Sequence, residues 1–283
     1  MNSRQVSRID LSPDLVDCVA FWTKNPAPMM GRIGELGKIP YYIQFTLTGY
    51  GRDIEPGLPD KRQLIEIFRE TAELAGAKRL VWRYDPIFFN EKYTKEYHCR
   101  AFREIARGLS GFSEKAVISF LDIYGKTKRN MRGIPVTEPD EEMMSDIAGS
   151  MASIAGEYGI RVESCAEKVD LSGVGVAHGC CIDPGLIEVL TGRTLLKKKD
   201  RNQRAECGCI ESVEVGAYDT CLCGCKYCYA NDSLEAVMRK RQDFDGSSPL
   251  LCSVLREEDR ITTRRTGKLF AGAQRKETEK VMN

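Results

Sequence analysis

The sequence predicts an α/β fold, namely a partial (β/α) TIM-like barrel of parallel strands that is followed by a cysteine-rich C-terminal segment. Strand-like runs alternate with amphipathic helical runs, which is the pattern of βα units and of a parallel sheet. No glycine-rich phosphate loop follows the first strand, and this favours an open or partial barrel over a dinucleotide-binding sheet. The predicted strands span residues 16–23, 41–48, 80–84, 116–123 and 160–165.

Amphipathic helices are predicted between these strands, over residues 61–75, 94–109 and 140–158. In the first of them Leu64, Ile67 and Phe68 recur at the spacing of one helical face, and Asp60 is the expected N-cap residue. The helices therefore have apolar stripes that can pack on the sheet. Trp22 and Trp82 lie in predicted strands, and we expect both in the core.

Composition excludes several classes of protein. The chain has 283 residues and 12 cysteines, and it has no apolar run near the ~20 residues that a membrane-spanning helix needs. A net charge of +1 argues against whole-surface binding to nucleic acid. Half of the cysteines lie between residues 207 and 228, and such clustering indicates metal binding rather than the disulfides of a small secreted protein. We therefore expect a cytoplasmic protein without membrane contact.

Three regions are predicted along the chain: residues 1–200 form the partial barrel, residues 201–252 form a cysteine-rich segment packed on the barrel mouth, and residues 253–283 form a polar tail. A basic stretch precedes the cysteines and includes Lys197, Lys198, Lys199 and Arg201. A solvated face is the ordinary explanation of this stretch. The more specific explanation is contact with a phosphate-bearing substrate or nucleic acid.

Polar residues follow one face of several predicted strands. Gln44, Thr46 and Thr48 alternate with apolar residues, and Arg83 and Asp85 share a face of the next strand. Helices cover the outside of such a barrel, so the polar face should point inward, and active sites of barrels lie at the C-terminal ends of strands. The predicted catalytic residues are Arg83, Asp85, Glu163 and Glu167, and the predicted cofactor-binding residues are Lys24, Asn25, Thr46 and Thr48. The alternative is that Arg83 and a glutamate form a structural ion pair.

The cysteine motif is the most specific feature of the chain. Cys221, Cys225 and Cys228 have the spacing C-x3-C-x2-C, with Tyr227 before the last cysteine. This spacing places three thiolates on one short loop, where they can hold three irons of a 4Fe–4S cluster and leave the fourth iron open. The same spacing with an aromatic residue is found in radical S-adenosylmethionine (SAM) enzymes, in which SAM binds the open iron. We therefore predict a 4Fe–4S cluster and SAM as cofactors.

Further cysteines leave alternatives open. Cys207 or Cys209 could supply a fourth ligand, which would close the cluster and make it structural or electron-transferring. Tetrahedral zinc held by these two cysteines and two cysteines of the loop is the competing metal site. Cys180 and Cys181 are adjacent, so they could form a vicinal disulfide or ligate a metal, although a packed thiol is the commoner outcome.

Several motifs together resemble domain-of-unknown-function family 1848: FWTKNPAPM, QFTLTGYG, RYDPIF, the run from His178 to Asp183, CGCIES and YDTCLCGCKYCYAN. The resemblance runs over residues 5–252. It implies that the C-terminal cysteines are similar to the cluster loop of radical SAM enzymes, and it implies no assigned activity.

The chain departs from these patterns in three ways. Family members usually begin with an additional strand and a loop rich in Ser-Arg-Arg-Thr-Asp, so we expect this chain to lack one N-terminal βα unit and to form five strands. The cysteine loop follows the last strand, whereas in radical SAM enzymes it follows the first. No Gly-Gly-Glu stretch that would hold the SAM amine ends the second strand.

Two classes of function are therefore expected. The first is an enzyme that cleaves SAM reductively and acts on an unknown substrate, with a reductant such as flavodoxin or ferredoxin as partner. The second is a non-catalytic protein in which a structural zinc or a closed iron–sulfur site ties the C-terminal segment to the barrel.

Overall fold

A parallel sheet forms the centre of the protein. The computed structural model describes residues 5–123, 125–264 and 270. The sheet has six strands, they follow one another in sequence order, and every neighbouring pair is parallel. The strands are β2 (Val19–Thr23), β3 (Tyr41–Thr46), β4 (Leu80–Ile87), β5 (Lys115–Phe120), β6 (Arg161–Cys165) and β7 (Ala177–Gly179). Among the described strands β2 and β7 are the two edges, so the sheet is open. The predicted α/β fold with parallel strands is confirmed.

The strand count differs from the prediction. All five predicted strands are present, but β7 adds a sixth at the edge of β6. β7 has only three residues, and its Ala177 and His178 are exposed. A strand of this length shows no periodicity, because alternation needs about four to eight residues to be recognised.

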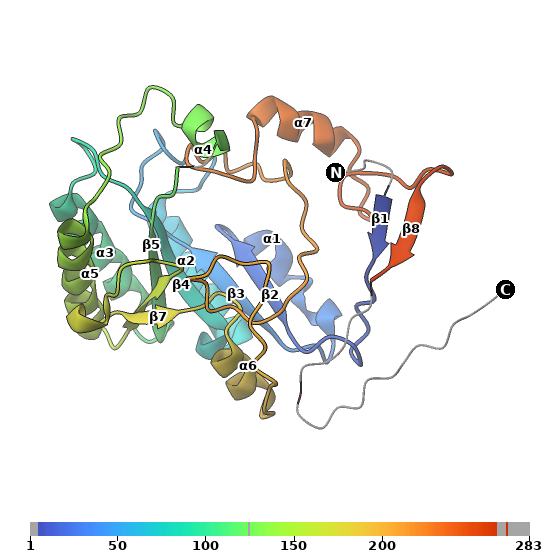
Figure 1. The fold of residues 1–283 in the computed structure, drawn as a ribbon, viewed down its shortest axis with the longest axis horizontal. Helices are drawn as coiled ribbons and strands as arrows, with labels where there is room; N and C mark the ends of the chain where they lie inside the picture. Colours follow the sequence, from blue (N-terminus) through green and yellow to red (C-terminus); the bar gives the residue numbers. More distant parts are fainter. Residues whose placement is uncertain (1–4, 124, 265–269, 271–283) are drawn as a thin grey trace.

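Three long helices cover one face of the sheet: α2 (Lys61–Ala75), α3 (Lys95–Leu109) and α5 (Glu141–Gly156). Each begins at a side-chain cap, and the predicted cap Asp60 accepts a hydrogen bond from the backbone N–H of Arg62. The caps of α3 and α5 are Thr94 and Asp140. In Figure 1, α3 and α5 stand on one side of the sheet, and the orange C-terminal segment arches over the other side.

The two faces of the sheet have opposite character. On β4, Trp82 and Tyr84 pack into the core beneath the helices, whereas Arg83 and Asp85 line the opposite side. Successive side chains of a strand point to opposite faces, so the alternation of apolar and polar residues along β4 produces both an apolar face and a polar face. The prediction that the polar series points away from the helices is confirmed for these residues.

Trp22 does not occupy the core. Its side chain is 49% exposed, and it lines the same side as Arg83. Trp22 lies on the edge strand β2, on the face away from the helices, so no layer covers it. Trp82 is fully buried, as expected.

Shorter elements complete the described chain. They are α1 (Ala27–Met30), η1 (Ile33–Leu36), η2 (Ala77–Arg79), α4 (Gly125–Asn130), η3 (Ser172–Val174), α6 (Pro184–Thr191) and α7 (Leu234–Gln242). A separate parallel pair joins β1 (Gln5–Arg8) to β8 (Arg260–Thr263). β8 falls within the expected polar tail, and residues 265–269 and 271–283 of that tail lie outside the described residues. No described helix combines the length and the apolar character that crossing a membrane requires.

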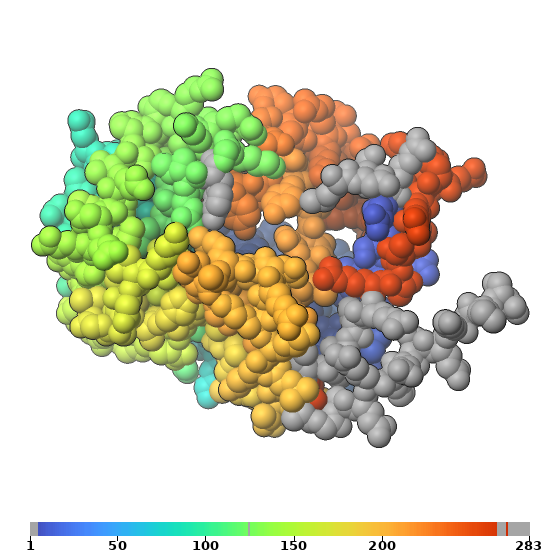
Figure 2. Space-filling model, viewed as in Figure 1, coloured from blue at the N-terminus to red at the C-terminus, as the bar shows by residue number. Residues whose placement is uncertain are grey.

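A large cavity lies between the polar face of the sheet and the C-terminal segment. Its volume is about 2760 Å³, and residues of the strand ends and of the segment 202–230 line it. Figure 2 shows this face hollowed, with blue N-terminal segments visible behind the orange C-terminal segment. The segment therefore takes the position that helices occupy on the opposite face.

Candidate active site and metal centre

The cavity brings together most of the residues that the sequence predicts as functional. The predicted residues that line it are Lys24, Asn25, Thr46, Arg83, Asp85, Cys207, Cys209, Cys221, Cys225 and Cys228. Thr48, Glu163 and Glu167 do not line it. The cysteine loop follows the last strand of the sheet in sequence, yet it faces the same space as the ends of β2, β3 and β4.

Backbone contacts dock the cysteine loop, residues 221–228, on the loop that follows β3. The N–H of Gly57 donates to the carbonyl of Cys223 at 3.0 Å, and the N–H of Lys226 donates to the carbonyl of Ile54 at 2.9 Å. Gly57 is needed for this approach, because a Cβ there would lie 2.6 Å from the carbonyl oxygen of Leu222.

Two asparagines hold the ends of the cysteine loop. The amide of Asn231 donates to the carbonyl of Cys221 at 2.7 Å. The amide of Asn130, at the end of α4, donates to the carbonyl of Cys228 at 3.1 Å. The loop is therefore positioned by protein contacts at its beginning, middle and end.

Glu55 is a buried anion between the sheet and the cysteine loop. It is 2% exposed, its carboxylate pairs with Lys24 at 2.9 Å and also with Lys61, and it accepts the hydroxyls of Thr48, at 2.8 Å, and of Tyr227. Burial raises the pKa of Glu55, but the two lysines and the hydrogen bonds outweigh burial and lower the pKa to about 2. The Thr48 hydroxyl, predicted to bind a cofactor, is thus occupied by Glu55.

Sequence reasoning did not single out Glu55. Glu55 lies in the turn after β3. The signal that could have identified it is its position, as an acidic residue after the C-terminal end of a predicted strand. Asp85 was found by that same signal.

Lys24 places a positive charge beside the cysteine loop. Its ammonium nitrogen lies 5.2 Å from the ring centre of Tyr227. Burial raises the pKa of Cys225 to about 11, although the charge of Lys24 acts to lower it. A hydrogen bond with Cys223 lowers the pKa of the Cys221 thiol, and Lys24 adds to this effect. Lys24 therefore favours thiolates at the cavity wall.

Arg83 and Asp85 form an ion pair at the cavity wall. The Nε of Arg83 donates to Oδ2 of Asp85 at 3.0 Å, and Ser119 donates to the other carboxylate oxygen. Burial raises the pKa of Asp85, but Arg83 and Ser119 outweigh burial, and the pKa lies below its ordinary value. The alternative that Arg83 pairs with a glutamate is wrong, because Asp85, two residues along β4, occupies its guanidinium.

Glu163 and Glu167 have hydrogen-bond partners other than Arg83. Glu163 accepts from Lys115 at 2.8 Å, and Lys115 also pairs with Asp183 at 2.6 Å. Glu163 lies opposite Val117 in the sheet, within reach of the first residue of β5 and away from the C-terminal strand ends. Glu167 accepts from the N–H of Phe120 at 2.8 Å, and burial raises its pKa to about 7.

The donor set of the cysteine loop suits an iron–sulfur cluster. Its three thiols line one cavity, beside a lysine, on a loop that the protein holds in position. Within the described residues no group of three or more His, Cys, Asp or Glu side chains is gathered closely enough for one metal ion. Each ligand of a cubane binds a different iron, so a cubane needs its thiols farther apart than a single ion does.

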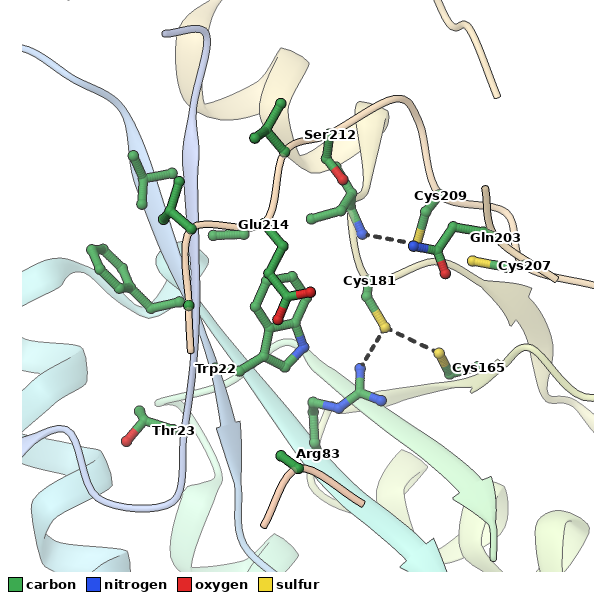
Figure 3. Close-up of a pocket in the computed structure, with 18 of the residues that line it drawn as sticks. Trp22, Thr23, Arg83, Cys165, Cys181, Gln203, Cys207, Cys209, Ser212 and Glu214 are labelled. Atoms are coloured by element: carbon green, nitrogen blue, oxygen red, sulfur yellow. Dashed lines mark hydrogen bonds between the residues drawn. The ribbon is translucent and has the colours of Figure 1, made fainter. Parts of the chain in front are cut away.

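Cys207 and Cys209 lie in a different packed group from Cys225 and Cys228. They pack against Cys165 and Cys181, whereas Cys225 and Cys228 pack with aromatic residues around Tyr50. Their predicted role as a fourth ligand of the loop cluster remains a prediction, and the packing favours other partners. Figure 3 shows Cys165, Cys181, Cys207 and Cys209 around one part of the cavity.

Fold and site together define an open parallel α/β protein with a cavity walled by strand ends and by a C-terminal cysteine loop. The family model described as Domain of unknown function (DUF1848) matches residues 1–230. Because this is most of the chain, the protein belongs to that family, as the motifs predicted. No curated protein and no solved structure shows significant similarity to the chain.

Proposed function

We propose that the protein is a radical-SAM-like iron–sulfur enzyme that cleaves S-adenosylmethionine reductively and acts on an unknown substrate. The observation that carries the proposal is the meeting of Cys221, Cys225 and Cys228 with the polar strand ends in one cavity. A 4Fe–4S cluster held by these cysteines would supply the electron and an open iron for SAM.

The residues of the cavity wall suit the polar groups of SAM. Lys24 supplies positive charge beside the thiolates, and its pairing with Glu55 holds its ammonium group in place. Asp85 has a depressed pKa and therefore remains a carboxylate, which can accept hydrogen bonds from an ammonium group. Asn25 and Thr46 add an amide and a hydroxyl at the same wall.

The fold supports a partial (β/α) barrel as the framework of this site. Parallel strands in sequence order, with the three long helices α2, α3 and α5 on one face, are what part of a barrel wall would present. We propose that the C-terminal segment closes the open side and brings the cluster to the strand ends. A cytoplasmic location and a flavodoxin or ferredoxin as electron donor belong to the same proposal.

Ion pairs bear on the proposed phosphate or nucleic acid contact. In the basic stretch Lys198 pairs with Glu211 at 2.9 Å, and Lys197 pairs with Glu188 at 3.2 Å. Carboxylates so close compete with phosphate for these lysines. The pairing favours the interpretation as a solvated face.

The alternative is a non-catalytic protein in which zinc or a closed cluster ties the C-terminal segment to the sheet. The observation that favours it is the burial of Cys225 and Tyr227, which are 8% and 7% exposed. Both pack with Tyr50 and Phe88, so the loop is part of the core as well as of the cavity wall.

Anaerobic reconstitution with iron and sulfide tests the proposal. The full chain should take up about four irons and four sulfides at the loop, and with dithionite and SAM it should release methionine and 5′-deoxyadenosine. Cys225→Ser is the variant that should lose the cluster and the cleavage. Cys99→Ser is the matched control, because Cys99 lies on α3 and does not line the cavity.

Two results would refute the enzyme. A cluster-loaded protein that neither binds nor cleaves SAM would leave the non-catalytic alternative. A colourless protein with stoichiometric zinc after anaerobic reconstitution would overturn the cluster itself.

A further inference from the structure

Five cysteines from distant parts of the sequence pack into one group, and four of them, all except Cys180, line the large cavity. Cys165 ends β6, Cys181 follows β7, and Cys207 and Cys209 belong to the C-terminal segment. These four lie around Ala166 in one apolar cluster, which Cys180 also contacts from outside the cavity. Figure 3 shows the four side chains on the same side of the cavity.

Two of the sulfur contacts in this group involve Cys181. The Sγ atoms of Cys165 and Cys181 are 3.0 Å apart, and the thiol of Cys181 also interacts with that of Cys209. Sulfur atoms around one tetrahedral zinc lie about 3.8 Å apart, because each Zn–S bond measures about 2.3 Å. Cys165, Cys181 and Cys209 are thus linked through their sulfur atoms, and Cys207 joins the group by packing.

The backbone of Cys181 is fixed by two buried side chains of β3. The hydroxyl of Tyr42 donates to the carbonyl of Cys181 at 2.5 Å, and the amide of Gln44 donates to the same oxygen at 2.9 Å. Tyr42 and Gln44 are both fully buried. Buried donors converging on one carbonyl indicate that the position of this cysteine is specified by the fold.

Donors also point at the sulfur atoms. Arg83, which is 4% exposed, donates from Nη1 to Sγ of Cys181 at 2.9 Å, and the N–H of Ile182 donates to Sγ of Cys209 at 3.2 Å. A neutral thiol is a weak acceptor, whereas a metal-bound thiolate is stabilised by such donors.

We propose that Cys165, Cys181, Cys207 and Cys209 form a second metal centre, which binds zinc or an iron–sulfur cluster through four thiolates. The described sulfurs are not yet gathered as a complete site, so binding draws them together and releases their protons. Four protein ligands fill the coordination of the metal, and the centre is therefore structural or electron-transferring and binds no substrate. This proposal does not rest on the function proposed for the loop.

The experiment removes the loop cluster first. The full-length triple variant Cys221→Ser/Cys225→Ser/Cys228→Ser is reconstituted anaerobically, once with Zn²⁺ and once with iron and sulfide, and bound metal is measured after desalting. We expect about one zinc, or about four irons, per chain in one arm. Adding Cys181→Ser or Cys209→Ser should lower bound metal at least tenfold, whereas Cys180→Ser is the adjacent control and should retain it.

Thiol alkylation read by mass spectrometry gives a second readout that does not depend on variants. The four cysteines should be protected in the metal-loaded protein and modified after chelation. A triple variant that binds no metal in either arm would overturn the proposal, as would loss of metal in Cys180→Ser but not in Cys181→Ser. A Cys165–Cys181 disulfide as the sole product of anaerobic purification under thiol reductant would also overturn it.

Discussion

The hydroxyl of Tyr227, in the cysteine loop, donates a hydrogen bond to the carboxylate of Glu55, in the turn that follows β3. Through Glu55 the same contact reaches Lys24 and Lys61. One buried carboxylate therefore links the end of a strand, the start of α2 and the cysteine loop. The position of the loop over the cavity depends on a residue that is itself outside the cysteine motif.

Glu55→Gln should lower the free energy of unfolding by roughly 3 kcal/mol, because it leaves two partly buried lysines without their counter-charge. Urea unfolding at neutral pH measures this. Tyr227→Phe is the matched comparison, since it removes one hydrogen bond to a charged group and should cost about 1.5 kcal/mol. Equal effects of the two variants would contradict the central role of the carboxylate.

Low pH should destabilise the folded protein through protonation of Glu55. The folded-state pKa of Glu55 is about 2, below the ordinary 4.5, so its contribution is present above the ordinary value and is lost as pH falls from 4.5 towards 2. In unfolding measurements across this range, Glu55→Gln should show a shallower loss of stability than the wild type.

Glu167 should change the stability of the protein with pH in the direction opposite to Glu55. Burial raises its folded-state pKa from 4.5 to about 7, so the folded protein binds more protons than the unfolded chain between these values, and stability falls as pH rises through them. Glu167→Gln can still accept the N–H of Phe120. It should be more stable than the wild type at about pH 8, by on the order of 2 kcal/mol, and should lose this advantage at about pH 4. An unchanged difference at both pH values would disprove the assignment.

Substitutions of Arg83 and of Glu163 should have different effects on the proposed reaction. Arg83→Leu removes the partner of Asp85 at the cavity wall, so it should abolish SAM cleavage and lower the melting temperature. Glu163→Gln leaves Lys115 paired with Asp183 outside the cavity, so it should cost about 1–2 kcal/mol of stability and keep cleavage per cluster near that of the wild type. Loss of cleavage in a folded, cluster-loaded Glu163→Gln protein would restore Glu163 as a catalytic candidate.

Gly57→Ala should displace the cysteine loop. Its Cβ would lie 2.6 Å and 2.8 Å from the carbonyl oxygens of Leu222 and Cys223, so we expect iron content after reconstitution to fall severalfold. Gly34→Ala is the control, because nothing lies within 4 Å of a Cβ at Gly34. Full iron loading in both variants would mean that the loop does not need this close approach.

Much of the fold could be predicted because it depends on local periodicity. The alternation of Trp82 and Tyr84 with Arg83 and Asp85 assigns two faces to a strand before any partner is known. The helix cap Asp60 follows from the chemistry of the first helical turn. β7 could not be predicted, because its three residues owe their conformation to pairing with β6.

The sequence by itself determined the parallel α/β class, the polar face of the strands and the three thiols of the cysteine loop, since each depends on residues close together along the chain. Tertiary structure decided which of these residues meet. Arg83 pairs with Asp85 and not with a glutamate, and Glu55 accepts a hydrogen bond from Tyr227. Cys165 and Cys181 pack with Cys207 and Cys209. Such contacts depend on how the C-terminal segment crosses the open face of the sheet, and burial then requires each charge and polar group to find a partner there.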